Sequence, residues 1–240
     1  MNAKEHYENH LASFYSWMIG NFDQKRADLE KFIIENEIYP TSTKVAIDLG
    51  AGTGVQAIAL SNLGFNVTAV DFNQQLLSEL TSNDESNAIN TVQADVRDVK
   101  DFESLQPELI VCCGDTITHL PDKPAVEKLL LDCESILTKN GKLILSFRDY
   151  SAELTDQQRF ISVKSDENQI LTCILEYTPD KVKVTDLLYE KENETWNQKV
   201  STYEKVRLSA QDIVNMIEQT GMKVIFNRPV DRMQTIIANK

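Results

Sequence analysis

The chain has 240 residues, of which 42% are hydrophobic and 25% charged, as expected for a globular α/β protein with a sizeable core. Its net charge of −13 and pI of about 4.7 argue against nucleic acid or an anionic membrane surface as the main partner, because both bind clustered Lys and Arg. No apolar run approaches the roughly 20 residues of a membrane span, and the first ten residues lack the apolar segment of a signal peptide. We therefore expect a cytoplasmic protein.

The first elements in the chain are helical, and an alternation of strands and helices follows. Apolar residues at helical spacing predict helix over residues 4–38, which Pro40 closes. Apolar strands are then predicted at 44–49, 65–71, 90–96, 108–115 and 142–150, and helices at 55–64, 74–80 and 123–141. Because the strands are continuous apolar runs, they favour a parallel sheet that is covered on both faces.

The hydrophobic pattern of the sequence changes after residue 155. Residues 156–204 contain strand-like segments that are separated by polar turns, which predicts an inserted antiparallel β meander. Ser209 then precedes a helix that runs to Gly221, and two strands end the chain. We predict N-terminal helices over 1–43, an α/β domain of 44–155 and 205–240, and the meander over 156–204.

A glycine-rich turn lies between the first strand and its helix. In AIDLGAGTG (46–54), Gly50, Gly52 and Gly54 allow close approach of a ligand to the backbone N–H groups of a helix N-terminus. A dinucleotide fingerprint would place its third glycine at the position of Val55, and Asp48 precedes the first glycine, so the spacing disfavours NAD.

Two acidic residues follow the next strands. Asp71 ends the second strand, where a carboxylate holds ribose hydroxyls in doubly wound folds. Asp95 follows the third strand and can accept a hydrogen bond from an adenine amino group, while Val96 can pack on the ring. The pattern predicts a ligand of nucleotide-like shape.

These motifs together resemble the class I S-adenosylmethionine (SAM)-dependent methyltransferases, which implies a Rossmann-like sheet and SAM as the cofactor. In that family the glycine turn faces the methionine part of SAM. The acidic residue after the second strand hydrogen-bonds the ribose hydroxyls, and the Asp after the third strand hydrogen-bonds the adenine. The cofactor-binding residues implied by the resemblance are Tyr15, Trp17, Asp48, Gly50, Gly52, Asp71, Phe72, Asp95, Val96 and Cys113.

Two further runs resemble the glycine/sarcosine N-methyltransferase type: CCGDTITHLPD (112–122) and SFRDYS (146–151). The resemblance implies that Arg148 clamps a substrate carboxylate and that His119 lies near the cofactor. Asp115 departs from the family, which has a neutral residue there, and a carboxylate could hold a cationic amine. The catalytic candidates are therefore His119, Asp115 and Arg148.

Structural roles remain open for each of these side chains. Arg148 could instead pair with Asp149, His119 could orient its loop, and Asp115 could cap the loop before the next helix. Tyr15 and Trp17 could equally be core residues of an amphipathic helix.

The predicted function is SAM-dependent methylation of a small molecule, with an amine as the favoured acceptor. O- or C-methylation of a small metabolite, and SAM binding without turnover, remain alternatives. Cys112, Cys113, Cys133 and Cys173 form no CxxC pair, so we expect buried free thiols and no metal site. We expect no nucleic-acid partner and no membrane contact. The exposed edges of the meander could pair with a second copy of the chain and form a homo-oligomer.

Overall fold

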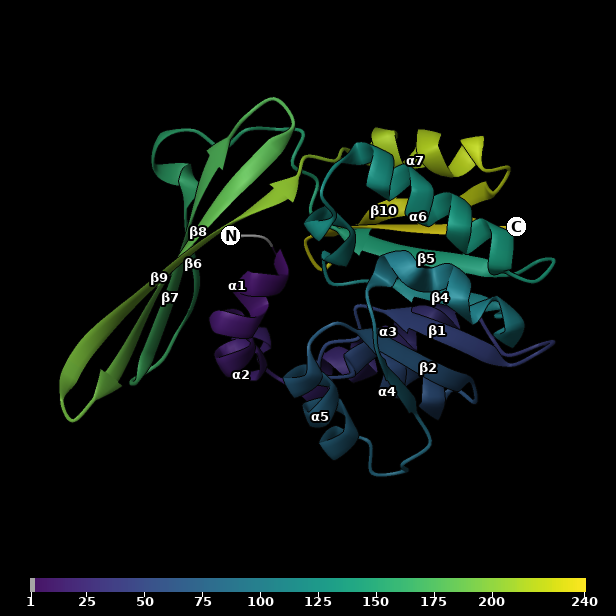
Figure 1. Cartoon of the computed structure of the whole chain (residues 1–240), viewed down its shortest axis with the longest axis horizontal. Helices are drawn as coiled ribbons and strands as arrows, with labels where there is room; N and C mark the ends of the chain where they lie inside the picture. Colours follow the sequence, from purple (N-terminus) through teal and green to yellow (C-terminus); the bar gives the residue numbers. More distant parts are fainter. Residues whose placement is uncertain (1–2) are drawn as a thin grey trace.

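Seven strands form the central sheet, in the order β10-β11-β5-β4-β1-β2-β3 (Figure 1). The computed structural model describes residues 3–240. The strands are β1 (Val45–Leu49), β2 (Asn66–Asp71), β3 (Asn90–Gln93), β4 (Leu109–Cys112), β5 (Lys142–Phe147), β10 (Lys223–Val230) and β11 (Met233–Asn239). Strands β1 to β5 are parallel, whereas β11 is antiparallel to β5 and β10. The α/β fold with a mostly parallel sheet is thus confirmed.

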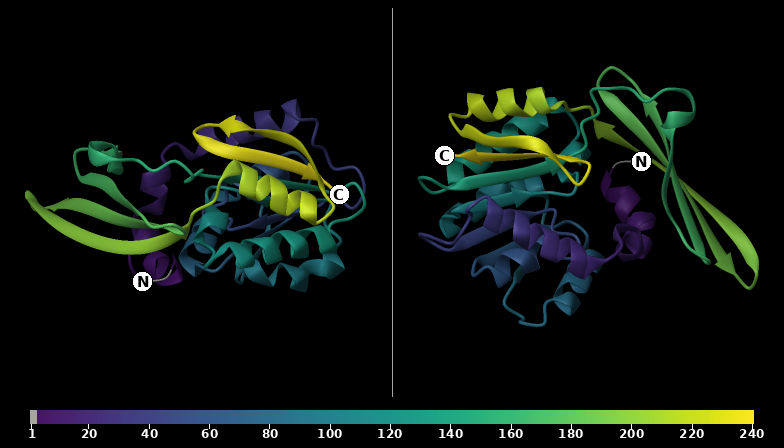
Figure 2. Two further views of the ribbon diagram at one scale, coloured as in Figure 1. Left: turned by 90° about the horizontal axis from the view of Figure 1, so that it is seen from above. Right: turned by 180° about the vertical axis from the view of Figure 1, so that it is seen from behind.

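Helices cover both faces of this sheet (Figure 2). Helices α3 (Phe22–Glu35), α4 (Val55–Asn62) and α5 (Gln74–Asn83) pack side chains such as Ile33, Leu60 and Leu77 on one face. The opposite face is covered by α6 (Lys123–Ile136), α7 (Ala210–Gln219) and the 3-10 segment η2 (Val96–Leu105). This double cover explains why β1 and β4 are almost wholly apolar.

Local sequence signals account for several helix ends. The Asp122 side chain accepts the N–H of Ala125 at the start of α6, and Ser209 and Asp212 form a capping box at the start of α7. Helix α6 ends at Ile136, five residues before the predicted end at Gly141, because Leu137 has an extended backbone and a turn joins Thr138 to Gly141.

The N-terminal segment contains four helical pieces instead of one continuous helix. They are α1 (Ala3–Asn9), η1 (Leu11–Phe14), α2 (Tyr15–Ile19) and α3. Gly20, with φ of +87°, interrupts the helix before α3, and the Asn21 side chain caps α3 by accepting the N–H of Gln24. Residues 1 and 2 of the predicted helical cover lie outside the described residues. No helix within residues 3–240 is long and apolar enough to cross a membrane.

The inserted strands form a separate antiparallel sheet, in the order β6-β7-β8-β9. Its strands are β6 (Phe160–Ser165), β7 (Gln169–Tyr177), β8 (Lys181–Glu192) and β9 (Thr195–Val206). This sheet extends beyond the α/β body as an arm, with α1 and α2 between the two (Figure 1). Its inner face buries Leu171 and Leu188 against Leu11 and Phe14 of η1.

One acidic side chain lies in the core of the central sheet. Asp48 on β1 is only 1% exposed. Burial, followed by the nearby charge of Asp71, raises the pKa of Asp48 to about 8, while the backbone N–H of Ala57 opposes the rise. The folded protein therefore holds a proton that the unfolded chain releases at much lower pH.

We expect stability to fall as the pH rises from 5 to 8. The pKa of Asp48 is raised on folding, so its contribution is complete below the unfolded value of 3.8, declines progressively above it and is lost once the pH exceeds about 8. The slope should be about 1.4 kcal/mol per pH unit between pH 5 and 7 in urea unfolding, and Asp48→Asn should flatten it.

Asp132→Asn is the matched control, because Asp132 is also a buried carboxylate but pairs with Lys128. This variant should keep the wild-type slope between pH 5 and 7. An unchanged slope in Asp48→Asn would show that Asp48 is already ionised in the folded protein.

Candidate functional site

A cavity of about 450 Å³ lies at the carboxyl ends of β1, β2 and β4. Eight of the residues singled out in the sequence line it: Tyr15, Gly50, Gly52, Asp71, Phe72, Asp95, Val96 and His119. Helix α1 closes one side with Ala3, Lys4 and Tyr7, and Lys181 and Glu204 of the arm line another part. The cavity therefore lies where the N-terminal helices, the α/β body and the arm meet.

The glycine turn lies directly above the end of β1. The N–H of Gly50 donates to the carbonyl of Val70 at 2.8 Å, which ties the turn to β2. A Cβ atom at Gly50 would come within 2.5 Å of the Thr116 side chain, so only glycine fits there. A Cβ atom added at Gly52 would lie 3.4 Å from the Tyr15 ring, which is about van der Waals contact. The turn thus exposes its backbone to the cavity between Thr116 and Tyr15.

Asp71 lines the same cavity and also holds the turn in place. Its Oδ2 accepts the N–H of Gly52 at 2.9 Å, and its Oδ1 accepts the N–H of Asn73 at 2.8 Å. Burial raises the pKa of Asp71, although the backbone N–H groups of Asn73, Gly52 and Phe72 oppose this. Each oxygen retains a lone pair that can accept a further hydrogen bond from a ligand.

Asp95 and Val96 lie at the start of η2, beside Phe72 on the cavity wall. The Asp95 carboxylate accepts the backbone N–H of Arg97 at 2.9 Å and forms an ion pair with the Arg97 guanidinium at 2.6 Å. These bonds to Arg97 lower the pKa of Asp95 despite its partial burial. A ligand that contacts this carboxylate would share it with Arg97.

His119 ends the short segment η3 (Thr116–His119), which follows β4. Its ring stacks on Tyr203 of the arm with centroids 5.6 Å apart, and Tyr7 meets it edge-on at 5.5 Å. Burial and then the charge of Lys205 lower the pKa of His119 to about 3. The imidazole is therefore neutral at neutral pH. Within residues 3–240, its buried Nδ1 has no hydrogen-bond partner.

Asp115 does not face the cavity, contrary to the proposal that it holds a substrate amine. It is 3% exposed and forms an ion pair at 2.5 Å with Lys205, which is itself 4% exposed. It also accepts the backbone N–H of Arg148 at 2.9 Å and lies 3.3 Å from the Tyr150 hydroxyl. Burial opposes ionisation, but Lys205, Arg148 and His119 together lower the pKa of Asp115. Its negative charge is already neutralised inside the protein.

Arg148 lies beside this ion pair, outside the cavity wall. Desolvation of the guanidinium lowers its pKa, but the nearby charge of Asp115 and the contact with Tyr150 raise this pKa overall. The alternative pairing with Asp149 is not found, because the Asp149 carboxylate accepts the N–H groups of Ser151 and Ala210. The guanidinium thus remains available for a carboxylate group of a ligand.

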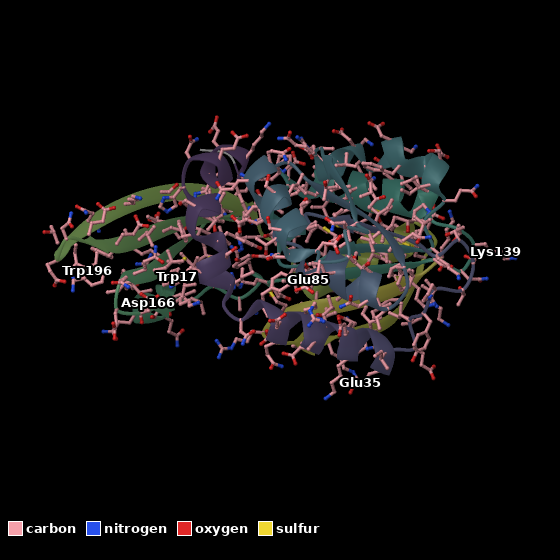
Figure 3. The ribbon with its side chains drawn as sticks, turned by 90° about the horizontal axis from the view of Figure 1, so that it is seen from below. Trp17, Glu35, Glu85, Lys139, Asp166 and Trp196 are labelled. Carbon is pink, nitrogen blue, oxygen red and sulfur yellow. The ribbon has the colours of Figure 1, made fainter. Side chains whose placement is uncertain are left out.

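Three residues assigned to the cofactor site lie elsewhere. Trp17 donates its indole N–H to Asp166, and Lys164 lies over its ring at 5.2 Å, so Trp17 joins α2 to the β6–β7 turn (Figure 3). Cys113 is buried, and burial raises the pKa of its thiol to about 12. Asp48 lies in the core below the turn. None of the three lines the cavity.

The structure adds residues that sequence reasoning missed. Tyr7 lines the cavity and packs edge-on against Phe72 at 5.4 Å, and Lys205 neutralises Asp115. Neither residue belongs to a recognisable motif, so no local signal marked them. No cluster of potential metal ligands occurs among the residues that the structure describes.

Comparison with known proteins agrees with this geometry. Residues 46–141 match the family described as a methyltransferase domain. The glycine/sarcosine N-methyltransferase of Aphanothece halophytica is 27% identical over 157 residues, which are 63% of this chain and 59% of that protein. The chain thus spans less than two thirds of the length of this curated relative.

Solved structures show the same fold at low sequence identity. The CcbJ methyltransferase from Streptomyces caelestis has a TM-score of 0.78 at 15% identity, covering 97% of this chain and 96% of its own. SAM-bound CalS10, an amino pentose methyltransferase from Micromonospora echinaspora, has a TM-score of 0.74 at 11% identity, covering 92% and 93%. Residues 46–141 therefore match a methyltransferase domain, and the chain shares the fold of these methyltransferase structures.

Proposed function

We propose that this protein transfers the methyl group of SAM to the nitrogen of a small amine. The observation that carries the proposal is the convergence of Gly52, Asp71, Asp95 and His119 on one cavity of about 450 Å³. This volume is in the range of small-molecule sites. The similarity to the glycine/sarcosine N-methyltransferase of Aphanothece halophytica supports nitrogen as the acceptor atom.

The residues present fit SAM. The turn at Gly50 and Gly52 would lie against its methionine part, and the Asp71 carboxylate would accept the ribose hydroxyls. Phe72 and Val96 supply apolar surface for the adenine ring, and Asp95 lies within the same wall. When bound, SAM supplies an activated methyl group, so that a nitrogen–carbon bond forms while the sulfur–carbon bond breaks and its electron pair stays on sulfur.

The residues around His119 favour an amine that binds as the free base. An amine attacks only through its lone pair, so it must be unprotonated. Because Lys205 neutralises Asp115, that carboxylate cannot stabilise an ammonium ion. The neutral His119 can accept a hydrogen bond from the amine N–H and so orient the nitrogen, while the proton released after the transfer leaves directly to water. The aromatic rings of Tyr7 and Tyr203 limit access of water to this end of the cavity.

Arg148 is the proposed contact for a substrate carboxylate. A planar guanidinium suits bidentate binding of a carboxylate, and this one has no carboxylate side chain as a direct ion-pair partner among residues 3–240. An amino acid with a free amine would then extend from Arg148 toward His119. This arrangement would align the nitrogen for in-line attack.

The function is tested by a turnover assay that mixes the protein with SAM and a panel of amines and amino acids, including glycine and sarcosine. Mass spectrometry follows S-adenosylhomocysteine and the methylated products. N-methylated product supports the proposal. Methylation of hydroxyl or carbon acceptors alone would replace it with O- or C-methylation, and SAM binding without product from any acceptor would favour a SAM-binding protein without turnover.

Asp71→Ala should weaken SAM binding by about 1–3 kcal/mol, roughly 5–150-fold in Kd, because it removes an acceptor for the ribose hydroxyls. Isothermal titration calorimetry measures the change. Asp122→Ala is the matched control, since that carboxylate also accepts a backbone N–H but caps α6 outside the cavity. Equal affinity in wild type and Asp71→Ala would remove Asp71 from the site.

Arg148→Met should raise KM for a carboxylate-bearing acceptor by about 10–100-fold while leaving the Kd for SAM unchanged, because a charged hydrogen bond is lost only to the acceptor. Steady-state kinetics and calorimetry separate the two effects. Arg228→Met, at an exposed position on β10, should alter neither value. Loss of SAM binding in Arg148→Met would show that the role of Arg148 is structural.

A further inference from the structure

A group of buried polar side chains lies between α1 and the arm, outside the cavity wall. His6 of α1 is fully buried, and Asp186 of β8 and Ser201 of β9 face each other in the strand register and are also buried. His6 Nδ1 and Ser201 Oγ share a hydrogen bond of 2.8 Å, and the other ring nitrogen, Nε2, lies 3.2 Å from Oδ2 of Asp186. Two neighbouring strands thus contact the imidazole at both of its nitrogens.

The same three residue types form the catalytic triad of serine hydrolases, but this group cannot reach a substrate. None of the three residues lines the cavity, and Ser201 is only 6% exposed. A nucleophile must touch the atom that it attacks. The group therefore acts on the protein chain itself, by holding α1 against the arm.

A polar group at this interface is costly, which makes its geometry informative. Leu11 and Phe14 of η1 pack on apolar side chains of the arm in the same interface. An apolar side chain at position 6 would avoid the desolvation of an imidazole and a carboxylate. Contacts at both ring nitrogens add direction instead, because they fix the plane of the ring. Cys173 donates its thiol to Oδ1 of Asp186 at 2.9 Å and so holds the carboxylate in turn.

Aromatic contacts connect His6 to His119 in the cavity wall. The His6 ring stacks on Tyr203, with centroids 3.9 Å and planes 21° apart. The same tyrosine stacks on His119, with centroids 5.6 Å and planes 17° apart. Tyr7, the residue that follows His6 in α1, meets the His119 ring edge-on at 5.5 Å. The position of His6 therefore determines where two of the rings against His119 lie.

His119 depends on these rings for its orientation. Its buried Nδ1 has no hydrogen-bond partner in the part of the chain that the structure describes. No bond at that nitrogen fixes the plane of the imidazole, in contrast to His6. Ring packing by Tyr7 and Tyr203 takes the place of such a bond.

We propose that His6 is a positioning residue for methyl transfer, because it holds the two tyrosine rings that keep the His119 imidazole directed at the acceptor nitrogen. His6 itself lies outside the cavity and touches neither SAM nor the acceptor. The inference rests on the proposed function, in which His119 orients the amine.

The kinetic test compares His6→Ala and His6→Phe with the wild type. Phenylalanine keeps an apolar ring against Tyr203 and so preserves the packing, but it lacks both ring nitrogens. Each variant should lower kcat by about 10–100-fold, because small misplacements of a group that orients the substrate slow the reaction by such factors. The rate is expressed per SAM-binding site, and the Kd for SAM should stay within about twofold of the wild type. A purely structural role would reduce the number of sites and leave kcat per site unchanged.

His10→Phe is the matched control. His10 is also buried, lies one helical turn after His6, and loses an imidazole in the same way. Its ring contacts His6 and Phe14, and within residues 3–240 it contacts no tyrosine ring. This variant should keep the wild-type kcat.

A second measurement needs no methyl acceptor. The chain has only three histidines, at positions 6, 10 and 119, so NMR can assign their ring resonances by substitution. The His119 ring protons lie beside the Tyr7 and Tyr203 rings, whose ring currents shift their resonances. These resonances should move or broaden in both His6 variants and remain in place in His10→Phe.

Wild-type kcat per site in both His6 variants would overturn the proposal, as would His119 resonances that neither variant moves. An equal loss of kcat in His10→Phe would also overturn it. A wild-type protein that methylates no amine would refute the proposed function alone, and the His119 resonances would still decide whether His6 positions that ring.

Discussion

A buried ion pair between Asp115 and Lys205 joins the two sheets of this protein, and the geometry of the site depends on it. Asp115 follows β4 in the body, and Lys205 lies near the end of β9 in the arm. The same carboxylate holds the backbone N–H of Arg148 after β5. Removing either charge would leave the other buried without compensation, which is strongly destabilising. The ion pair thus fixes the relative positions of three chain segments. It also keeps the Asp115 carboxylate from contacting a methyl acceptor directly.

The shape of the cavity also depends on the Asp71 carboxylate, which binds two backbone N–H groups. It accepts the backbone N–H of Gly52 in the turn after β1 and that of Asn73 after β2, so these bonds hold the shape of the glycine turn. Preorganisation of this kind lowers the entropy that binding must offset. The aromatic residues Tyr7, Phe72 and His119 continue this ordered wall toward the arm, because each ring packs against another.

The arm contributes to the cavity in two ways. Its inner face contacts η1 and the α/β body, and so closes the cavity that the body alone would leave open. Lys181 and Glu204 of the arm also line the cavity directly.

The sequence by itself determined the parallel sheet, the glycine turn and the carboxylates at the ends of β2 and β3, because apolar runs and turn glycines act over a few residues. It also indicated the antiparallel insertion through alternation. Only the tertiary structure decided that Asp115 pairs with Lys205, 90 residues away, and that Trp17 bonds to Asp166, 149 residues away. Tyr7 likewise reaches the cavity only through the docking of α1. Local spacing cannot encode such contacts, since they arise when distant segments pack together and desolvate one another's polar groups.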